Sequence, residues 1–259
     1  MVVTFSQRYV ALGDSFTEGV GDWDPSRPNG VRGWADRVAE QLALADPSWG
    51  YANLAIRGKK LRQVIDEQIE PALELEPTLV SIYAGGNDIL RPKVDIDAIV
   101  AAYDSAIGRL RASGAAVLVF TGFDSGQSPI FGRTRGRTAL YNELVRESAD
   151  AHGAILVDYW RLKVLQDERY WDVDRLHMSP AGHILTAKKV LEVLRATDAL
   201  DVPELDTLPA RDRIQRLKHD ARWAREYLGP WVSRRLRGVS SGDNLSARFP
   251  SPVQLTPQG

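Results

Sequence analysis

The sequence contains no cysteine among its 259 residues. This absence excludes disulfide bonds, a thiol nucleophile and thiolate sites for zinc or iron–sulfur clusters. The sequence also lacks any uninterrupted run of about 18 apolar residues, so no membrane span is expected. A net charge of −1 gives no overall attraction to nucleic acid or to anionic lipid. The N-terminus has no basic, apolar leader. We therefore expect a cytoplasmic protein. No Walker A pattern occurs and no cluster of His and carboxylates has convincing metal spacing, so we expect no metal and no cofactor.

Hydrophobic residues make up 44% of the chain and charged residues 26%. These values are typical of a globular protein. At about 100–200 residues per domain, the length predicts one large domain, alone or with an appendage. We place the domain at residues 1–200. A linker, a basic helix and a loose tail are expected at 201–259, packed on or beside the domain.

Short apolar runs alternate with longer amphipathic stretches along the first part of the chain. Where the runs are nearly continuous, they suit strands that are buried on both faces. This alternation predicts an α/β fold, a parallel sheet with helices on both faces. Ligands bind such sheets beyond the carboxyl ends of the strands. The expected strands are 9–12, 51–54, 79–83, 115–121 and 154–157, and the expected helices are 33–45, 60–74, 95–113, 134–152 and 180–196.

The C-terminal part differs in charge. Residues 209–248 hold ten Lys and Arg but four Asp and Glu, a net charge of +6. Apolar residues at helical spacing predict one helix there, and the Gly, Ser and Pro that follow at 238–259 predict a loose tail. We favour a helix that packs on the domain and leaves its arginines in water. An anchor for anionic lipid or RNA is the alternative. The apolar stripe is Ile214, Leu217, Ala221, Ala224 and Leu228, and the expected packing residues are Trp223, Tyr227 and Leu228.

Two of the loops that follow strands carry residues suited to nucleophilic catalysis. Gly13-Asp14-Ser15 comes directly after the first strand, which places a hydroxyl at the functional edge. Taken alone, Ser15 is better explained as the N-cap of a helix. Asp174 and His177 follow the last strand at a spacing that lets the carboxylate reach the imidazole. Ser179-Pro180 then begins the last helix, so His177 lies on the loop.

Two further loops offer hydrogen-bond donors. In Gly85-Gly86-Asn87-Asp88 the glycines allow a sharp turn, and the Asn87 amide donates two hydrogen bonds. After the second strand, Gly58 offers a backbone N–H. Each loop alone is an ordinary turn. Together with the hydroxyl and the His–Asp pair, they supply what acyl transfer requires.

The blocks Gly13-Asp14-Ser15, Gly58, Gly85-x-Asn87-Asp88 and Asp174-x-x-His177 resemble those of the SGNH (GDSL) hydrolase superfamily, in the same order, over about residues 8–196. The resemblance implies a flavodoxin-like three-layer α/β/α fold with five parallel strands. It also implies a metal-free serine esterase or lipase acting on small-molecule esters.

The resemblance also implies a role for each matching residue. Ser15 would be the nucleophile, His177 the general base and acid, and Asp174 the residue that orients His177. The oxyanion hole would be formed by the backbone N–H groups of Ser15 and Gly58 and by the side chain of Asn87. The surroundings of Gly58 depart from the family pattern. We interpret the neighbouring cations Arg57 and Lys59 as solvated loop charges.

Other interpretations are open. The same scaffold could serve as a non-catalytic ligand-binding module, and within the family a lysophospholipase or thioesterase is an alternative to the short-chain esterase that we expect. Gly238-x-Ser240-x-Gly242 fits the nucleophile-elbow pattern but lacks a preceding strand. Gly19-Val20-Gly21 is a weak dinucleotide motif. The loop 122–133 is expected to wall the pocket through Phe123, Pro129 and Phe131.

Overall fold

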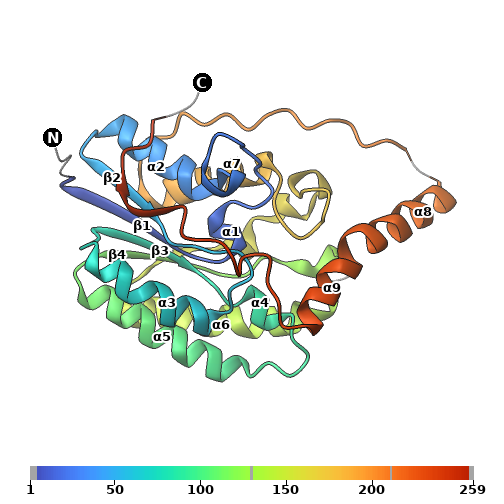
Figure 1. Ribbon diagram of the computed structural model, residues 1–259, viewed down its shortest axis with the longest axis horizontal. Helices are drawn as coiled ribbons and strands as arrows, with labels where there is room; N and C mark the ends of the chain where they lie inside the picture. Colours follow the sequence, from blue (N-terminus) through green and yellow to red (C-terminus); the bar gives the residue numbers. More distant parts are fainter. Residues whose placement is uncertain (1–4, 129–130, 211, 257–259) are drawn as a thin grey trace.

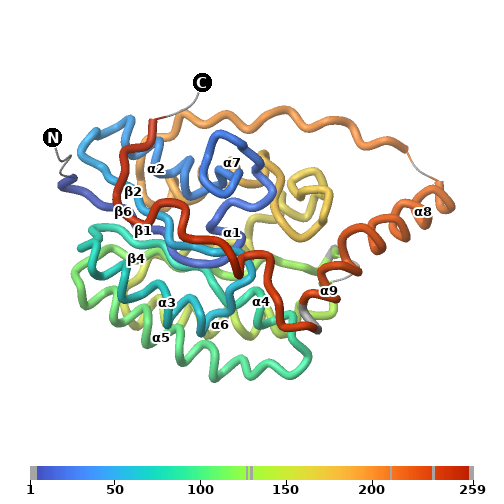
Figure 2. Tube along the Cα trace, viewed as in Figure 1, coloured from blue at the N-terminus to red at the C-terminus, as the bar shows by residue number. Residues whose placement is uncertain are grey.

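The computed structural model describes residues 5–128, 131–210 and 212–256, which fold around one twisted sheet (Figures 1 and 2). Its strands lie in the order β5-β4-β3-β1-β2-β6. Strands β1 to β5 are parallel to one another, as the alternation of strands and helices predicts. The strands are β1 (Gln7–Gly13), β2 (Trp49–Asn53), β3 (Leu79–Tyr83), β4 (Ala116–Phe120), β5 (Ile155–Val157) and β6 (Phe249–Val253).

Helices cover both faces of the sheet, which gives three layers (Figure 1). Alternate side chains of β1 face opposite helical layers, as the two-residue repeat of a strand requires. Tyr9 and Ala11 pack with α2 (Gly33–Ala45) and α7 (Pro180–Leu194). Val10 and Leu12 pack with the three helices of the other layer. These are α3 (Leu61–Glu74), α5 (Ile96–Ala112) and α6 (Arg135–His152). The predicted α/β architecture is confirmed.

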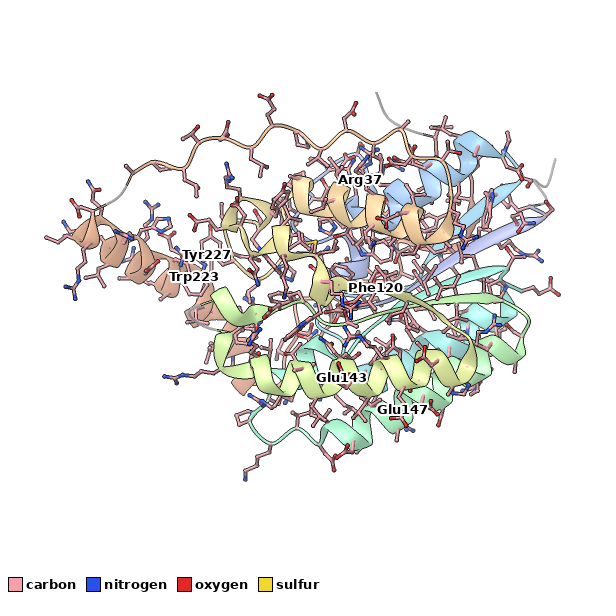
Figure 3. All side chains as sticks on the ribbon, turned by 180° about the vertical axis from the view of Figure 1, so that it is seen from behind. Arg37, Phe120, Glu143, Glu147, Trp223 and Tyr227 are labelled. Atoms are coloured by element: carbon pink, nitrogen blue, oxygen red, sulfur yellow. The ribbon has the colours of Figure 1, made fainter. Side chains whose placement is uncertain are left out.

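The long helices are amphipathic, with one apolar face against the sheet. In α6, Tyr141, Val145 and Ala149 are buried at four-residue spacing. Glu143 and Glu147 lie on the exposed side of the same helix (Figure 3). Helix α7 begins as predicted, because the Ser179 hydroxyl accepts a hydrogen bond from the backbone N–H of Gly182 and Pro180 stands at the first position.

A sixth strand corrects two expectations, the five-stranded sheet and the wholly loose tail. Residues Phe249–Val253 pair antiparallel with β2 and form an edge of the sheet. The segment reads Phe-Pro-Ser-Pro-Val, and a pattern with two prolines predicts a loop. Proline lacks a backbone N–H, which restricts it to edge strands. Because Pro250 and Pro252 have no N–H to donate, the free side of β6 cannot pair fully with a further strand.

Arg248, the residue before β6, is buried with its ion-pair partner Asp36 of α2. The two guanidinium nitrogens donate to the two carboxylate oxygens over 2.9 and 2.7 Å. The guanidinium also donates to backbone carbonyls, among them those of Glu18, Pro28 and Arg32. Burial raises the pKa of Asp36, although Arg248 acts against that shift. This ion pair fixes the C-terminal segment to the domain.

The basic segment contains two helices instead of the single predicted one. The first, α8 (Arg213–Trp223), is separated from α9 (Gly229–Leu236) by a π-helical turn. The segment is attached to the body near Trp223, which is buried, and Tyr227 lies close by (Figure 3). The first part of the predicted apolar stripe is not buried: Ile214 and Leu217 are 64% and 61% exposed. No helix in the described part of the chain is long and apolar enough to span a membrane.

Candidate active site

The chain makes a tight turn after β1 that presents Ser15. Gly13 adopts a φ of +147°, and a side chain at this position would collide with the carbonyl of Tyr83 on β3. The amide of Gln68 holds the turn, because its oxygen accepts from the Gly13 N–H over 2.8 Å and its nitrogen donates to the Gly13 carbonyl over 2.9 Å. The glycine is therefore required by the close approach of two strands.

The N-cap interpretation of Ser15 is wrong. Asp14 caps the short helix α1 (Ser15–Glu18), since its carboxylate accepts from the Phe16 N–H over 3.2 Å. Ser15 is the first helical residue. Within the described residues its hydroxyl makes no hydrogen bond. A serine at the edge of a pocket whose hydroxyl is not used for capping is available for chemistry.

His177 is held by Asp174 on the loop before α7. The ring Nδ1 lies 2.6 Å from Asp174 Oδ2, and the other carboxylate oxygen accepts from the backbone N–H groups of Leu176 and His177. Burial opposes ionisation of Asp174, but the hydrogen bonds from His177 hold its pKa below the usual value. A neutral ring that donates from Nδ1 keeps Nε2 as the acceptor.

Two neighbouring segments fix this loop. A side chain at Gly21 would lie 2.0 Å from the Met178 carbonyl, so the absence of a Cβ lets the two loops pack together. Gly19 and Gly21 thus act as packing glycines, and the dinucleotide motif has no structural support. On the other side, Trp223 Nε1 donates to the Asp174 carbonyl over 3.0 Å.

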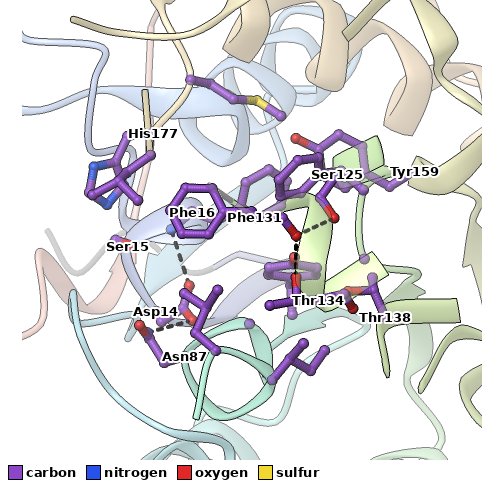
Figure 4. Close-up of a pocket in the computed structure, with 18 of the residues that line it drawn as sticks. Asp14, Ser15, Phe16, Asn87, Ser125, Phe131, Thr134, Thr138, Tyr159 and His177 are labelled. Atoms are coloured by element: carbon purple, nitrogen blue, oxygen red, sulfur yellow. Dashed lines mark hydrogen bonds between the residues drawn. The ribbon is translucent and has the colours of Figure 1, made fainter. Parts of the chain in front are cut away.

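Asn87 lies at the start of α4 (Gly86–Ile89), the short helix that follows β3. Its Nδ2 donates to Asp14 Oδ2 over 3.1 Å and to the Lys59 carbonyl over 3.0 Å. Figure 4 shows the Asp14 and Asn87 side chains turned toward each other beneath Ser15. The Asn87 amide therefore links three of the four predicted loops, those after β1, β2 and β3.

Ser15, Asn87 and His177 line one pocket, and Figure 4 shows His177 on the same side as Ser15. The Ser15 hydroxyl and the His177 ring are not hydrogen-bonded to each other within the described residues. Such contacts are often long in unliganded enzymes and shorten once substrate is bound. The structure therefore brings the predicted nucleophile, base and amide donor to a common cavity.

Gly58 is not among the residues that line this pocket. Its φ is +82°, and a Cβ there would lie 2.0 Å from Ser240 Oγ. The Ser240 hydroxyl donates to the Arg57 carbonyl over 3.0 Å, so this serine of the nucleophile-elbow pattern is a structural contact. The role of Gly58 in an oxyanion hole stays a prediction.

Arg57 is not the solvated loop charge that the sequence suggests. Its guanidinium and its backbone N–H both donate to the buried carboxylate of Glu18. Glu18 is fully buried, and an uncompensated buried carboxylate is costly. The pair therefore ties the loop after β2 to the helix that carries Ser15. Lys59 pairs with Glu67 over 2.6 Å. Sequence reasoning missed Glu18 because nothing local indicates that its carboxylate is buried.

Beyond the polar group, the pocket is mostly apolar and opens to solvent. This is the character of a small-molecule site. Phe123 and Phe131 line it, which confirms that part of the prediction for the loop 122–133. Pro129 lies outside the described residues. Other apolar lining residues include Ile89, Leu90, Tyr159, Trp171, Met178 and Trp231.

His183 is buried and structural. Its Nδ1 accepts from the Trp34 N–H and its Nε2 faces the Val20 carbonyl, each over 3.1 Å. Burial lowers the pKa of His183 to about 4, so the ring is neutral at ordinary pH. Among the described residues no cluster of three or more His, Cys, Asp or Glu is arranged to hold a metal ion.

Burial raises the pKa of Asp14 from 3.8 to about 7, against the opposing effects of the Phe16 N–H, His177 and Asn87. The folded protein therefore keeps a proton that the unfolded chain loses, so stability falls as pH rises between these two values. We expect wild type to lose stability relative to Asp14→Asn from pH 4 to pH 7. Urea unfolding at several pH values measures this difference. A pH-independent difference would contradict the burial of an ionisable Asp14.

A model of the GDSL-like lipase/acylhydrolase family matches residues 11–185, about two thirds of the chain. A search of the curated proteins found no significant match to the sequence. The family match includes the predicted nucleophile and the loop of His177. It ends before α8.

Solved structures share the fold. TesA aligns with a TM-score of 0.62 at 23% identity, over 73% of this chain and 98% of its own. Axe2, an acetylxylan esterase from Geobacillus stearothermophilus, aligns with a TM-score of 0.59 at 22% identity, over 75% and 96%. The psychrotrophic esterase EstA from Pseudoalteromonas sp. aligns with a TM-score of 0.57 at 16% identity, over 73% and 97%.

Proposed function

The chain belongs to the GDSL-like lipase/acylhydrolase family and is an esterase of the SGNH type, and we propose that it cleaves short-chain acyl or acetyl esters through an acyl-enzyme on Ser15. The observation that carries this proposal is the Asp174–His177 pair, with 2.6 Å between Oδ2 and Nδ1, in the same pocket as an uncommitted serine hydroxyl. A serine hydroxyl is a weak nucleophile until a positioned base removes its proton.

In the proposed mechanism His177 Nε2 accepts the proton of Ser15 as the hydroxyl attacks the ester carbonyl carbon. Asp174 holds the ring orientation and stabilises the imidazolium that forms. The proton then passes to the leaving alcohol. Water attacks the acyl-enzyme with the same histidine as base, which releases the acid and restores Ser15.

The negative oxygen of the tetrahedral intermediate requires donors that are already in place. We assign this role to the Ser15 and Gly58 backbone N–H groups and to the Asn87 amide. Asn87 Nδ2 donates to Asp14 in the unliganded protein, and donation to the oxyanion would replace that bond. A raised Asp14 pKa supports the exchange, because a protonated carboxyl competes less for the amide.

A substrate panel tests the proposal. It contains p-nitrophenyl esters from acetate to palmitate and acetylated xylo-oligosaccharides, since one structural neighbour is an acetylxylan esterase. We expect kcat/KM to be highest for acetate to butanoate and to fall at least about tenfold by palmitate, because each methylene that a pocket rejects costs a factor of this order or more. A preference for palmitate over acetate would contradict the short-chain assignment and favour a lysophospholipase or thioesterase.

A further inference from the structure

The C-terminal segment 212–248 contacts two of the loops that build the candidate active site. Trp223 is 5% exposed, and its indole N–H donates to the carbonyl of Asp174 over 3.0 Å. Arg175, the next residue of that loop, lies over the Trp223 ring at 5.0 Å and pairs with Asp220 over 2.9 Å. Arg175 adopts a φ of +56°, which is unusual for a residue with a side chain. These contacts hold it there.

The other end of the segment is fixed as well. Ser240 donates to the carbonyl of Arg57, beside Gly58, and Arg248 forms the buried ion pair with Asp36. A side chain at Gly242 would lie 2.2 Å from the Arg57 carbonyl, so this part of the tail lies directly against the loop after β2. The helix α9 lies between these two fixed points.

Trp231 of α9 lines the pocket that contains Ser15, Asn87 and His177. The family match ends at residue 185, so this wall is not part of the matched region. The pocket is otherwise lined by the domain itself, on the loops after β1, β3 and β4 and on the loop of His177. A large indole at the pocket, on a segment that is fixed at both ends, is a steric boundary. The pocket beside Ser15 is mostly apolar, and we assign it to the acyl chain, the part of the ester that stays attached to Ser15 in the acyl-enzyme.

We propose that residues 212–248 form a built-in cap of the active site, in which Trp231 closes the acyl pocket and limits the length of the acyl chain. The proposal rests on the proposed esterase function for its catalytic readout. It gives the appendage a role in substrate specificity, beyond the packing on the domain that its sequence predicts. It also explains why the pocket would favour short chains.

The test compares Trp231→Ala, Trp231→Phe and the matched control Val232→Ala, whose side chain is 39% exposed on the same helix. Each protein is assayed with p-nitrophenyl esters from acetate to decanoate and with acetate esters of increasingly long alcohols. We expect Trp231→Ala to raise the decanoate-to-acetate ratio of kcat/KM by about tenfold or more. Trp231→Phe should give a smaller increase and Val232→Ala no change. An unchanged acyl ratio, or relief only in the alcohol series, would overturn the proposal.

A binding measurement separates this proposal from the esterase function. In the Ser15→Ala background, which needs no turnover, Trp231→Ala should strengthen the binding of decanoate relative to hexanoate by at least about fivefold, the gain from burying even part of the four additional methylenes. Circular dichroism and thermal unfolding verify that both proteins are folded. If wild type hydrolyses no ester, the proposed function fails, and the binding ratio still decides the cap. If wild type is an esterase and the ratio does not change, the cap alone fails.

Discussion

Replacement of Ser15 by alanine should lower kcat for the best p-nitrophenyl ester by about five to six orders of magnitude. The side chain is the proposed nucleophile, and the other serine that lines the pocket is committed to a structural hydrogen bond. Ser125, which also lines the pocket, donates its hydroxyl to the Phe131 carbonyl. The thermal stability should change little, because the Asp14 cap and the Gln68 clamp on Gly13 are retained.

Ser240→Ala is the informative comparison, because Ser240 is the serine of the competing nucleophile-elbow pattern. Its hydroxyl supports the Arg57 carbonyl, so we expect a loss of no more than about tenfold in kcat, the scale of one neutral hydrogen bond. Equal losses in the two variants, or near-native turnover in Ser15→Ala, would contradict the assignment of Ser15.

Arg248→Met should reduce the free energy of unfolding by about 3–5 kcal/mol. The substitution leaves Asp36 buried without its cation and removes donors from several backbone carbonyls. It also frees the segment that leads into β6. Urea unfolding measures the loss, and a fall in esterase activity at temperatures where the domain is still folded would link the tail to the site.

Arg237→Met provides a control for the removal of a positive charge, since Arg237 is exposed. It should change stability by less than about 0.5 kcal/mol. The double variant Asp36→Asn with Arg248→Met should cost less than the sum of the single losses, because the unpaired charge is gone. A loss under about 1 kcal/mol for Arg248→Met would show that the buried pair does not anchor the tail.

The periodicity of the sequence predicts the sheet and its covering helices well. The expected helix 33–45 and strand 79–83 agree with α2 and β3, because continuous apolar runs and four-residue apolar spacing are direct consequences of burial. The loops after the strands are predictable for a related reason. Parallel strands end at one edge, so Ser15, Asn87 and His177 converge on one pocket.

The C-terminal segment is where sequence reasoning fails. Its prolines indicate a loop, yet an edge strand accepts them. Arg248 stands in a polar tail, and no local pattern indicates a buried partner more than 200 residues away. The same applies to Glu18 and Arg57, whose pairing depends on two loops meeting in space. The division into 1–200 and 201–259 stays a prediction, as does the cytoplasmic location.

Covalent labelling tests most directly whether Ser15 is the nucleophile and His177 its base. Wild type, Ser15→Ala and His177→Ala are each treated with a p-nitrophenyl alkylphosphonate and digested, and the modified peptide is identified by mass spectrometry. One phosphonyl group should appear on Ser15 of wild type, none on Ser15→Ala, and His177→Ala should react at least about a hundredfold more slowly, since general-base assistance is worth that much. Labelling at another serine, or an equal rate without His177, would mean that this pocket does not hold a Ser15–His177 catalytic pair.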